Sequence, residues 1–133
     1  MNRRYALVAS RAGHHCEYCR APEVVFNMQF EVEHIIPPSR GGSDVDDNLA
    51  LACRACNVYK SAHVTGEDDA SRTEARLFHP RRDSWNEHFT LDRQSGMIRG
   101  LSAVGRATVS RLNMNLAIRL PARLIWMRLG LLS

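Results

Sequence analysis

The alternation of apolar and polar residues divides the first half of the chain into short elements. Good helix formers precede Gly13, a residue typical of helix ends. A loosely alternating apolar stretch ends at Pro37 and Pro38, where a strand has to stop. Turn-forming residues separate it from a second apolar strand, which runs into a helix without a breaker. The predicted order is helix 3–12, strand 26–36, loop 39–44, strand 49–52 and helix 55–62.

The next part of the chain is more polar and holds weaker signals. Residues 65–88 are mixed in charge and read as a connecting segment, with a helix predicted around 70–77 and a break at Pro80. Strands at 89–91 and 97–101 flank a loop whose length and composition are typical of a hairpin.

The remaining residues predict two helices. Ser102 can cap the first of them, which carries Val104, Val109 and Leu112. The second helix has one apolar face, and Pro121 within it must either kink the helix or lie in its first turn. The residues of that apolar face are Leu116, Leu120, Leu124, Met127 and Leu131.

All four cysteines fall in two Cys-x2-Cys pairs, Cys16 with Cys19 and Cys53 with Cys56. Each pair can form a tight turn that points two thiolates at one position, and two such turns supply the tetrahedral sulfur set that Zn²⁺ prefers. A four-sulfur site has no open coordination position, so this Zn²⁺ is predicted to be structural. Two disulfides or an iron–sulfur cluster are the alternatives, and the lack of a secretion signal and the isolated pair spacing disfavour them.

A small set of polar residues lies between and just after the cysteine pairs. Glu33 and His34 come near the end of the first predicted strand, Asn48 precedes the second, and Asn57 lies in the first turn of the helix. Taken singly, such residues are more often surface or turn positions. Together with the cysteine pairs and the Pro-Pro-Ser-Arg-Gly-Gly stretch at 37–42, they resemble the motif of the HNH endonucleases, in the zinc-supported branch of that family.

The resemblance implies hydrolysis of a DNA phosphodiester bond. His34 is the predicted general base, because a near-neutral imidazole suits that role at cellular pH. Glu33 and Asn57 are implied to hold one divalent cation, and their oxygen donors favour Mg²⁺ or Mn²⁺. Asn48 is implied to orient the strands and the base. Adjacent strand residues point to opposite faces, so Glu33 and His34 can face one spot only where the strand ends or bends.

Composition limits the class of protein. With 133 residues and 44% apolar side chains, the chain can fill the interior of a single domain. No apolar run approaches the ~20 residues that a membrane helix needs, and the apolar stretch after the basic amino terminus is too short for a secretion signal. We therefore expect a cytoplasmic protein that has no membrane contact.

The charges are unevenly distributed. All 14 acidic residues lie at or before Asp92, whereas seven arginines follow it. Such a basic segment favours a polyanion such as nucleic acid, although an ordinary solvated surface of an arginine-rich chain has the same composition. Lys60, the only lysine, shares a helical face with Asn57 and is expected either to reach a phosphate or to be a solvated helix residue. The other candidate DNA contacts are Arg40, Arg106, Arg111 and Arg119.

These observations predict an α+β fold with a small ββα-metal core, a four-cysteine zinc site, an accessory hairpin and C-terminal helices. The predicted function is a metal-dependent DNA endonuclease, and the alternative is a non-catalytic zinc-dependent module that binds nucleic acid. RNA as the substrate, the choice between monomer and homodimer, and a partner that lends specificity all stay open. The predicted divisions are a helix at 1–13, the nuclease core at 14–64, the connecting segment at 65–88 and a basic accessory region at 89–133.

Overall fold

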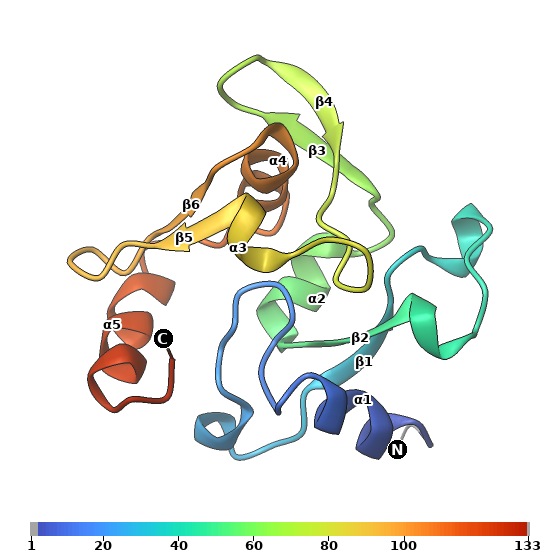
Figure 1. Cartoon of the computed structure of the whole chain (residues 1–133), viewed down its shortest axis with the longest axis horizontal. Coiled ribbons are helices and arrows are strands. Elements are labelled where there is room, and N and C mark those ends of the chain that lie inside the picture. The colour runs from blue at the N-terminus through green and yellow to red at the C-terminus, as the bar shows by residue number, and fades with distance from the viewer. Residues whose placement is uncertain (1–2, 133) are drawn as a thin grey trace.

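This computed structural model describes residues 3–132, in which three two-stranded antiparallel sheets and five α-helices are joined by loops and three short 3-10 helices (Figure 1). The fold is therefore of the mixed α+β kind that the sequence predicts. None of the helices in this part is both long and apolar enough to cross a membrane. The strands are β1 (Glu31–His34), β2 (Leu49–Ala52), β3 (Thr65–Asp68), β4 (Thr73–Arg76), β5 (Phe89–Leu91) and β6 (Ile98–Gly100). The helices are α1 (Tyr5–Arg11), α2 (Arg54–Lys60), α3 (Trp85–His88), α4 (Ala103–Arg111) and α5 (Arg119–Arg128).

The strands β1 and β2 and the helix α2 form the centre of the molecule (Figure 1). β1 pairs with β2 so that His34 lies opposite Leu49. All four residues of β2 are buried, and α2 begins directly after it, with Cys53 as the N-cap. The predicted order of strand, loop, strand and helix is confirmed. β1 is shorter than expected because residues Glu23–Phe26 form a 3-10 turn.

The hairpin β3–β4 occupies the region where a helix was predicted at 70–77, so that prediction is wrong. The Asp68 carboxylate accepts hydrogen bonds from the backbone of Ala70 and the hydroxyl of Ser71, and these bonds organise the turn. Gly66 lets β3 lie directly on α4, since a Cβ there would meet the backbone oxygen of Ala107 at 2.6 Å. Tertiary contacts therefore override the local helix propensity.

The hairpin β5–β6 and the helix α4 follow the sequence prediction. Phe89 pairs with Gly100 across the hairpin. Ser102 caps α4, where its hydroxyl accepts a hydrogen bond from the backbone of Gly105 at 3.0 Å. Both elements pack on the same core as Phe78 and Trp85.

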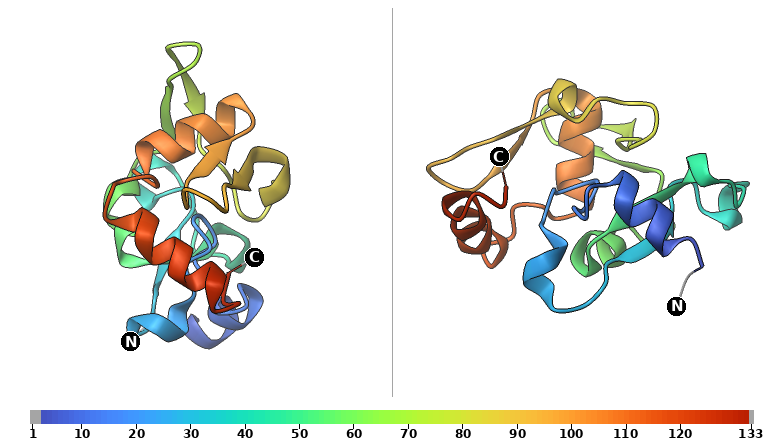
Figure 2. Two further views of the ribbon diagram at one scale, coloured as in Figure 1. Left: turned by 90° about the vertical axis from the view of Figure 1, so that its left-hand side faces the viewer. Right: turned by 60° about the horizontal axis from the view of Figure 1, so that its bottom comes forward.

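The helix α5 lies on the opposite side of α2 from the loop that joins β1 to β2, as two views agree (Figures 1 and 2). Pro121 is the third residue of α5, so it lies in the first turn, where its missing N–H is not needed. The apolar face is shorter than predicted, because Leu116 and Leu131 are both outside the helix. Arg123 is buried on this helix, and its guanidinium donates to the backbone oxygens of Gly96 and Met114.

Candidate active site and metal centre

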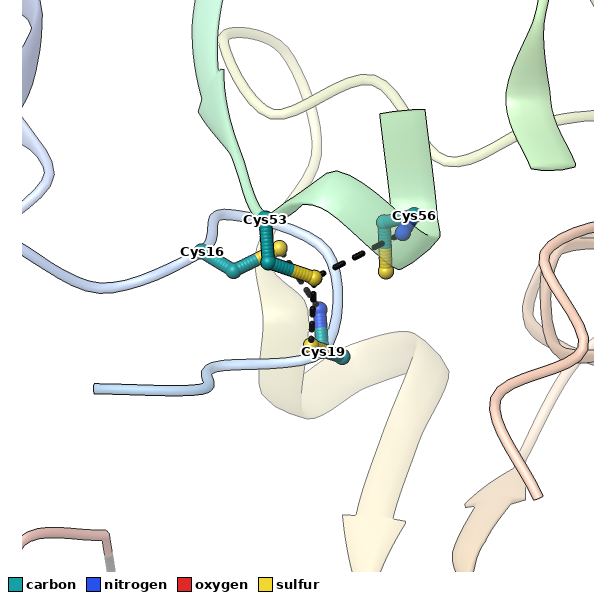
Figure 3. A group of neighbouring side chains, drawn as sticks. All are labelled: Cys16, Cys19, Cys53 and Cys56. Atoms are coloured by element: carbon teal, nitrogen blue, oxygen red, sulfur yellow. Dashed lines mark hydrogen bonds between the residues drawn. The ribbon is translucent and has the colours of Figure 1, made fainter. Parts of the chain in front are cut away.

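The four cysteines meet at the start of α2 (Figure 3). Cys16 and Cys19 come from the turn after α1, and Cys53 and Cys56 come from the end of β2 and the first turn of α2. All four are buried and none is in a disulfide. In each pair the backbone N–H of the second cysteine points at the sulfur of the first, at 3.5 Å. We call these four residues the cysteine cluster.

The geometry of the cysteine cluster fits a tetrahedral zinc site. The four sulfur atoms lie within 4.8 Å of one another, and Cys19 Sγ is 3.7 Å from Cys53 Sγ. Four sulfurs at about 2.3 Å from a central Zn²⁺ would be about 3.8 Å apart. A disulfide would require about 2.0 Å, so the arrangement fits a metal better than a bridge. The cluster therefore has the donors and the spacing of a structural zinc site.

The surroundings of the cysteine cluster supply positive charge and cover. Arg119, at the start of α5, donates to Cys56 Sγ at 3.1 Å and to the backbone oxygens of Leu112 and Asn113. Trp85 donates its indole N–H to the backbone oxygen of Tyr18, which lies between the two cysteines of the first pair, at 2.7 Å. The arginine contact offsets part of the negative charge that four thiolates carry.

His34 is the last residue of β1, and its imidazole is partly open to solvent. The exposed fraction of its side chain is 33%. Its Nε2 lies 2.9 Å from Oδ1 of Asp44, a residue of the following loop whose side chain is 79% exposed. Arg4 approaches the other Asp44 carboxylate oxygen at 3.8 Å. Asp44 was predicted only as part of the loop 39–44, because it lies ten residues from His34 among turn-forming residues.

Asn48 holds the loop between β1 and β2 in place. The amide oxygen accepts from the Ile36 N–H at 2.9 Å, and the amide nitrogen donates to the Ile36 and Ser43 oxygens at 2.9 and 2.7 Å. Gly42 is required beside it, because a Cβ at that position would overlap the Ile36 oxygen. The resemblance implied an orienting role for Asn48, and these contacts hold the loop that follows His34.

Glu33 points to the opposite side of β1 from His34 and is enclosed by the protein. Its side chain accepts a hydrogen bond from the Tyr18 hydroxyl at Oε1 and pairs with the Lys60 ammonium at Oε2, 3.0 Å away. Only 7% of Glu33 is exposed. Burial raises the pKa of Glu33 above its ordinary value, and Lys60, Tyr18 and His34 offset only part of that shift. Neither carboxylate oxygen is open to a metal ion in this arrangement.

One family model matches part of this chain. Residues 16–63 match the family model described as HNH endonuclease. The chain contains an HNH endonuclease domain. The match begins at Cys16 and runs through β1, β2 and α2, so it covers both the cysteine cluster and the His34 region. No curated protein and no solved structure gave a match.

HNH endonucleases are phosphodiester hydrolases, so the class of chemistry and a nucleic-acid substrate follow from this domain. Their activity uses a divalent metal. Asn57, the second predicted ligand of that metal, lies within α2 and is half-buried, and its side-chain amide takes part in no hydrogen bond within residues 3–132. Of the two predicted ligands, Asn57 is therefore the more accessible.

Several basic residues that were predicted to contact DNA have partners within the protein, and Lys60 is also buried. Lys60 is 1% exposed and cannot meet a phosphate as placed. Arg106 binds both carboxylate oxygens of Asp68, at 2.7 and 3.1 Å, and Arg111 donates to the Thr65 oxygen. Arg119 likewise contacts the cysteine cluster, so the three predicted DNA contacts other than Lys60 and Arg40 also have a partner within the protein, and a docking surface after Asp92 stays a prediction.

Arg40 and a cleft beside the loop between β1 and β2 remain accessible to a phosphate. Arg40 is exposed and uses only its Nε, which donates to the Ala62 oxygen at 2.7 Å. The cleft has a volume of about 230 Å³, and Gly42 and Asn48 line one side of it. His79 and Arg82, from the segment before α3, line the other side. Arg82 is exposed, so the cleft has a cationic side chain at its edge.

Proposed function

We propose that this protein is a metal-dependent DNA endonuclease in which His34 is the general base. The pairing of the exposed His34 imidazole with Asp44, within the HNH domain, carries this proposal. A base that acts on water has to be reachable by solvent and held in one orientation. Asn48 supports that role, because its three hydrogen bonds fix the loop that carries Asp44.

The contact with Asp44 assigns the two ring nitrogens of His34. An ionised carboxylate can only accept hydrogen bonds, so the Nε2 atom that faces Asp44 carries a proton. In the neutral imidazole the lone pair then lies on Nδ1, which is the nitrogen that removes a proton from water. When Nδ1 becomes protonated, the Asp44 carboxylate stabilises the resulting positive charge.

A divalent cation, when bound, would supply positive charge at the leaving oxygen of the phosphodiester. Glu33 does not fit as its ligand, because both carboxylate oxygens already accept hydrogen bonds inside the protein. Asn57, the other residue that the resemblance implies as a ligand, keeps a half-buried side-chain amide oxygen that could bind the cation. We propose Arg40 and Arg82 as the phosphate contacts, because both are exposed and lie on the loop and the cleft next to it.

The test is cleavage of supercoiled plasmid by the wild type, His34→Ala and Asp44→Asn with Mg²⁺ or Mn²⁺. We expect metal-dependent nicking by the wild type and a rate at least ~100-fold lower for His34→Ala. Asp44→Asn should lose roughly tenfold or more, since the amide no longer stabilises the protonated ring. Binding of DNA without cleavage by the wild type would favour the zinc-dependent binding module. Faster cleavage of an RNA duplex than of plasmid DNA would instead indicate RNA as the substrate.

A further inference from the structure

We infer that Lys60 and Glu33 form a buried ion pair without net charge, and that this pair positions His34. In this arrangement Lys60 contacts no phosphate and Glu33 binds no metal. This inference rests on the proposed function in one respect, the role of His34 as the base. The geometry of the pair itself stands apart from it. The pair joins the last residue of α2 to the end of β1, directly behind the exposed imidazole.

Every proton of the Lys60 ammonium has a partner inside the protein. Nζ donates to Glu33 Oε2 at 3.0 Å, to the His34 backbone oxygen at 3.2 Å and to the Ile35 backbone oxygen at 2.9 Å. An ammonium has three donors, and these three oxygens use all of them. No donor is left for a phosphate, and the 1% exposure of Lys60 leaves no path to one.

The Glu33 carboxylate is closed from its other side by Tyr18. The Tyr18 hydroxyl donates to Glu33 Oε1, and Tyr18 is fully buried beside the first cysteine pair. A divalent ion on Glu33 would place a second buried cation next to a carboxylate that already balances the Lys60 ammonium. A buried charge without a partner is unfavourable, whereas the Lys60 and Glu33 charges balance each other.

The shape of the pair also accounts for the one lysine in the chain. All other basic residues of the 18 are arginines. A guanidinium is a planar fork whose donors diverge, and it cannot converge on three oxygens around a single point. A compact ammonium can, so this position requires lysine although the chain uses arginine elsewhere.

The three oxygens that accept from the Lys60 ammonium belong to three consecutive residues of the chain. This arrangement explains how the pair holds the His34 imidazole in position. Lys60 holds the backbone of His34 and Ile35 and the side chain of Glu33. Neighbouring strand residues alternate in direction, so fixing Glu33 inward fixes the outward direction of the His34 imidazole. A misplacement of about 1 Å in a catalytic group can lower a rate ~100-fold.

The first experiment observes the wild-type protein and needs no variant. Labelling with ¹⁵N at lysine alone gives one ammonium signal, since the chain has one lysine. We expect the Lys60 ammonium protons to exchange slowly with water, and the signal to stay in place when Mg²⁺ or a DNA duplex is added separately. A shift caused by Mg²⁺ would overturn the assignment of Glu33, and a shift caused by DNA would overturn that of Lys60.

The second experiment compares Lys60→Met, Lys60→Arg and Glu33→Gln with Arg54→Met. Arg54 is the matched control because it also joins α2 to β1, through an exposed pair with Glu31 at 3.4 Å. In proteins that keep their zinc and fold at the assay temperature, we expect kcat for plasmid nicking to fall roughly 10- to 100-fold for the first three variants. KM, the salt dependence and the Mn²⁺ concentration for half-maximal rate should change less than about twofold. Arg54→Met should match the wild type.

Three kinetic results would overturn the inference. A Glu33→Gln protein that needs tenfold more Mn²⁺ and regains its full rate there has lost a metal ligand. A Lys60→Met protein whose salt dependence flattens by about one unit has lost a phosphate contact. An unchanged kcat in folded Lys60→Met removes the positioning role. If the wild type does not cleave at all, the proposed function fails, while the ammonium signal still tests the pair.

Discussion

The two ends of α2 both bury charge, but they serve different purposes. At the first turn, Cys53 and Cys56 join the cysteine cluster, and Arg119 faces their negative charge. At the last residue, Lys60 pairs with Glu33. The four cysteines are buried, whereas the lysine end lies behind a histidine that stays partly exposed. A short helix with both ends fixed can thus connect a structural metal to a reactive side chain.

The largest expected effect comes from removing the metal at the cysteine end. We predict that a strong chelator unfolds the β1–β2–α2 unit, because structural zinc binding contributes about 10–16 kcal/mol and whole domains are stable by only about 5–15 kcal/mol. Far-ultraviolet circular dichroism should show the loss, and added Zn²⁺, but not Mg²⁺, should restore the signal. An unchanged spectrum with four freely titrating thiols would contradict the structural role of the cluster.

A smaller effect is expected from the arginine that faces the cysteine cluster. Arg119→Met should raise the Kd for Zn²⁺ about 10- to 100-fold, since it removes the hydrogen bond to Cys56 Sγ and the charge near the thiolates. Competition with a chromophoric chelator measures the Kd. Arg111→Met is the control, because Arg111 bonds only to the Thr65 backbone oxygen. Equal zinc affinities of the two variants would remove Arg119 from the metal centre.

The smallest effect concerns a charge pair away from both ends of α2. Hydrogen bonds from Arg106 hold the pKa of Asp68 well below its ordinary range. The ionised Asp68 therefore stabilises the fold above its unfolded pKa of about 3.9, and this contribution is lost as the pH falls through the lower folded pKa. Arg106→Met should lower the Tm by a few degrees at pH 7, and the difference from the wild type should shrink at pH values below about 4.

The same variant tests whether Arg106 binds DNA. Arg106→Met should leave the salt dependence of DNA binding unchanged, because its guanidinium is engaged by Asp68. The exposed Arg93 of the neighbouring hairpin loop provides the control, and Arg93→Met should leave the Tm unchanged. A flatter salt dependence with an unchanged Tm for Arg106→Met would return Arg106 to a docking surface.

The elements nearest the cysteines were predictable from the sequence because their signals are local. The pair spacing, the apolar run of β2 and the breaker-free stretch of α2 each lie within a few residues. The hairpin at β3–β4 was not predictable in this way, since its turn depends on Asp68 and on an arginine 38 residues later. The residues there have helix propensity, and only the packing of Gly66 on α4 decides otherwise.

The sequence predicted which residues make up the site, but it did not predict the hydrogen bonds and ion pairs among them. The sequence indicated His34 and the cluster, but charge alone cannot tell a solvated cation from one that is enclosed. Lys60, Arg106 and Arg119 were predicted to contact DNA because they are basic. Their acceptors within the protein, which are backbone oxygens, carboxylates and a thiolate, lie far away in the sequence and could not be recognised from it. The single lysine was the one local signal that Lys60 differs from the arginines.

The rate of plasmid nicking by His34→Ala, measured on protein with its zinc content determined, tests the central claim most directly. The account predicts that this variant keeps one Zn²⁺ per chain and the wild-type circular dichroism spectrum, because His34 lies outside the cysteine cluster. Its metal-dependent nicking should fall at least ~100-fold. A zinc-loaded, folded His34→Ala protein that nicks at the wild-type rate would contradict His34 as the base.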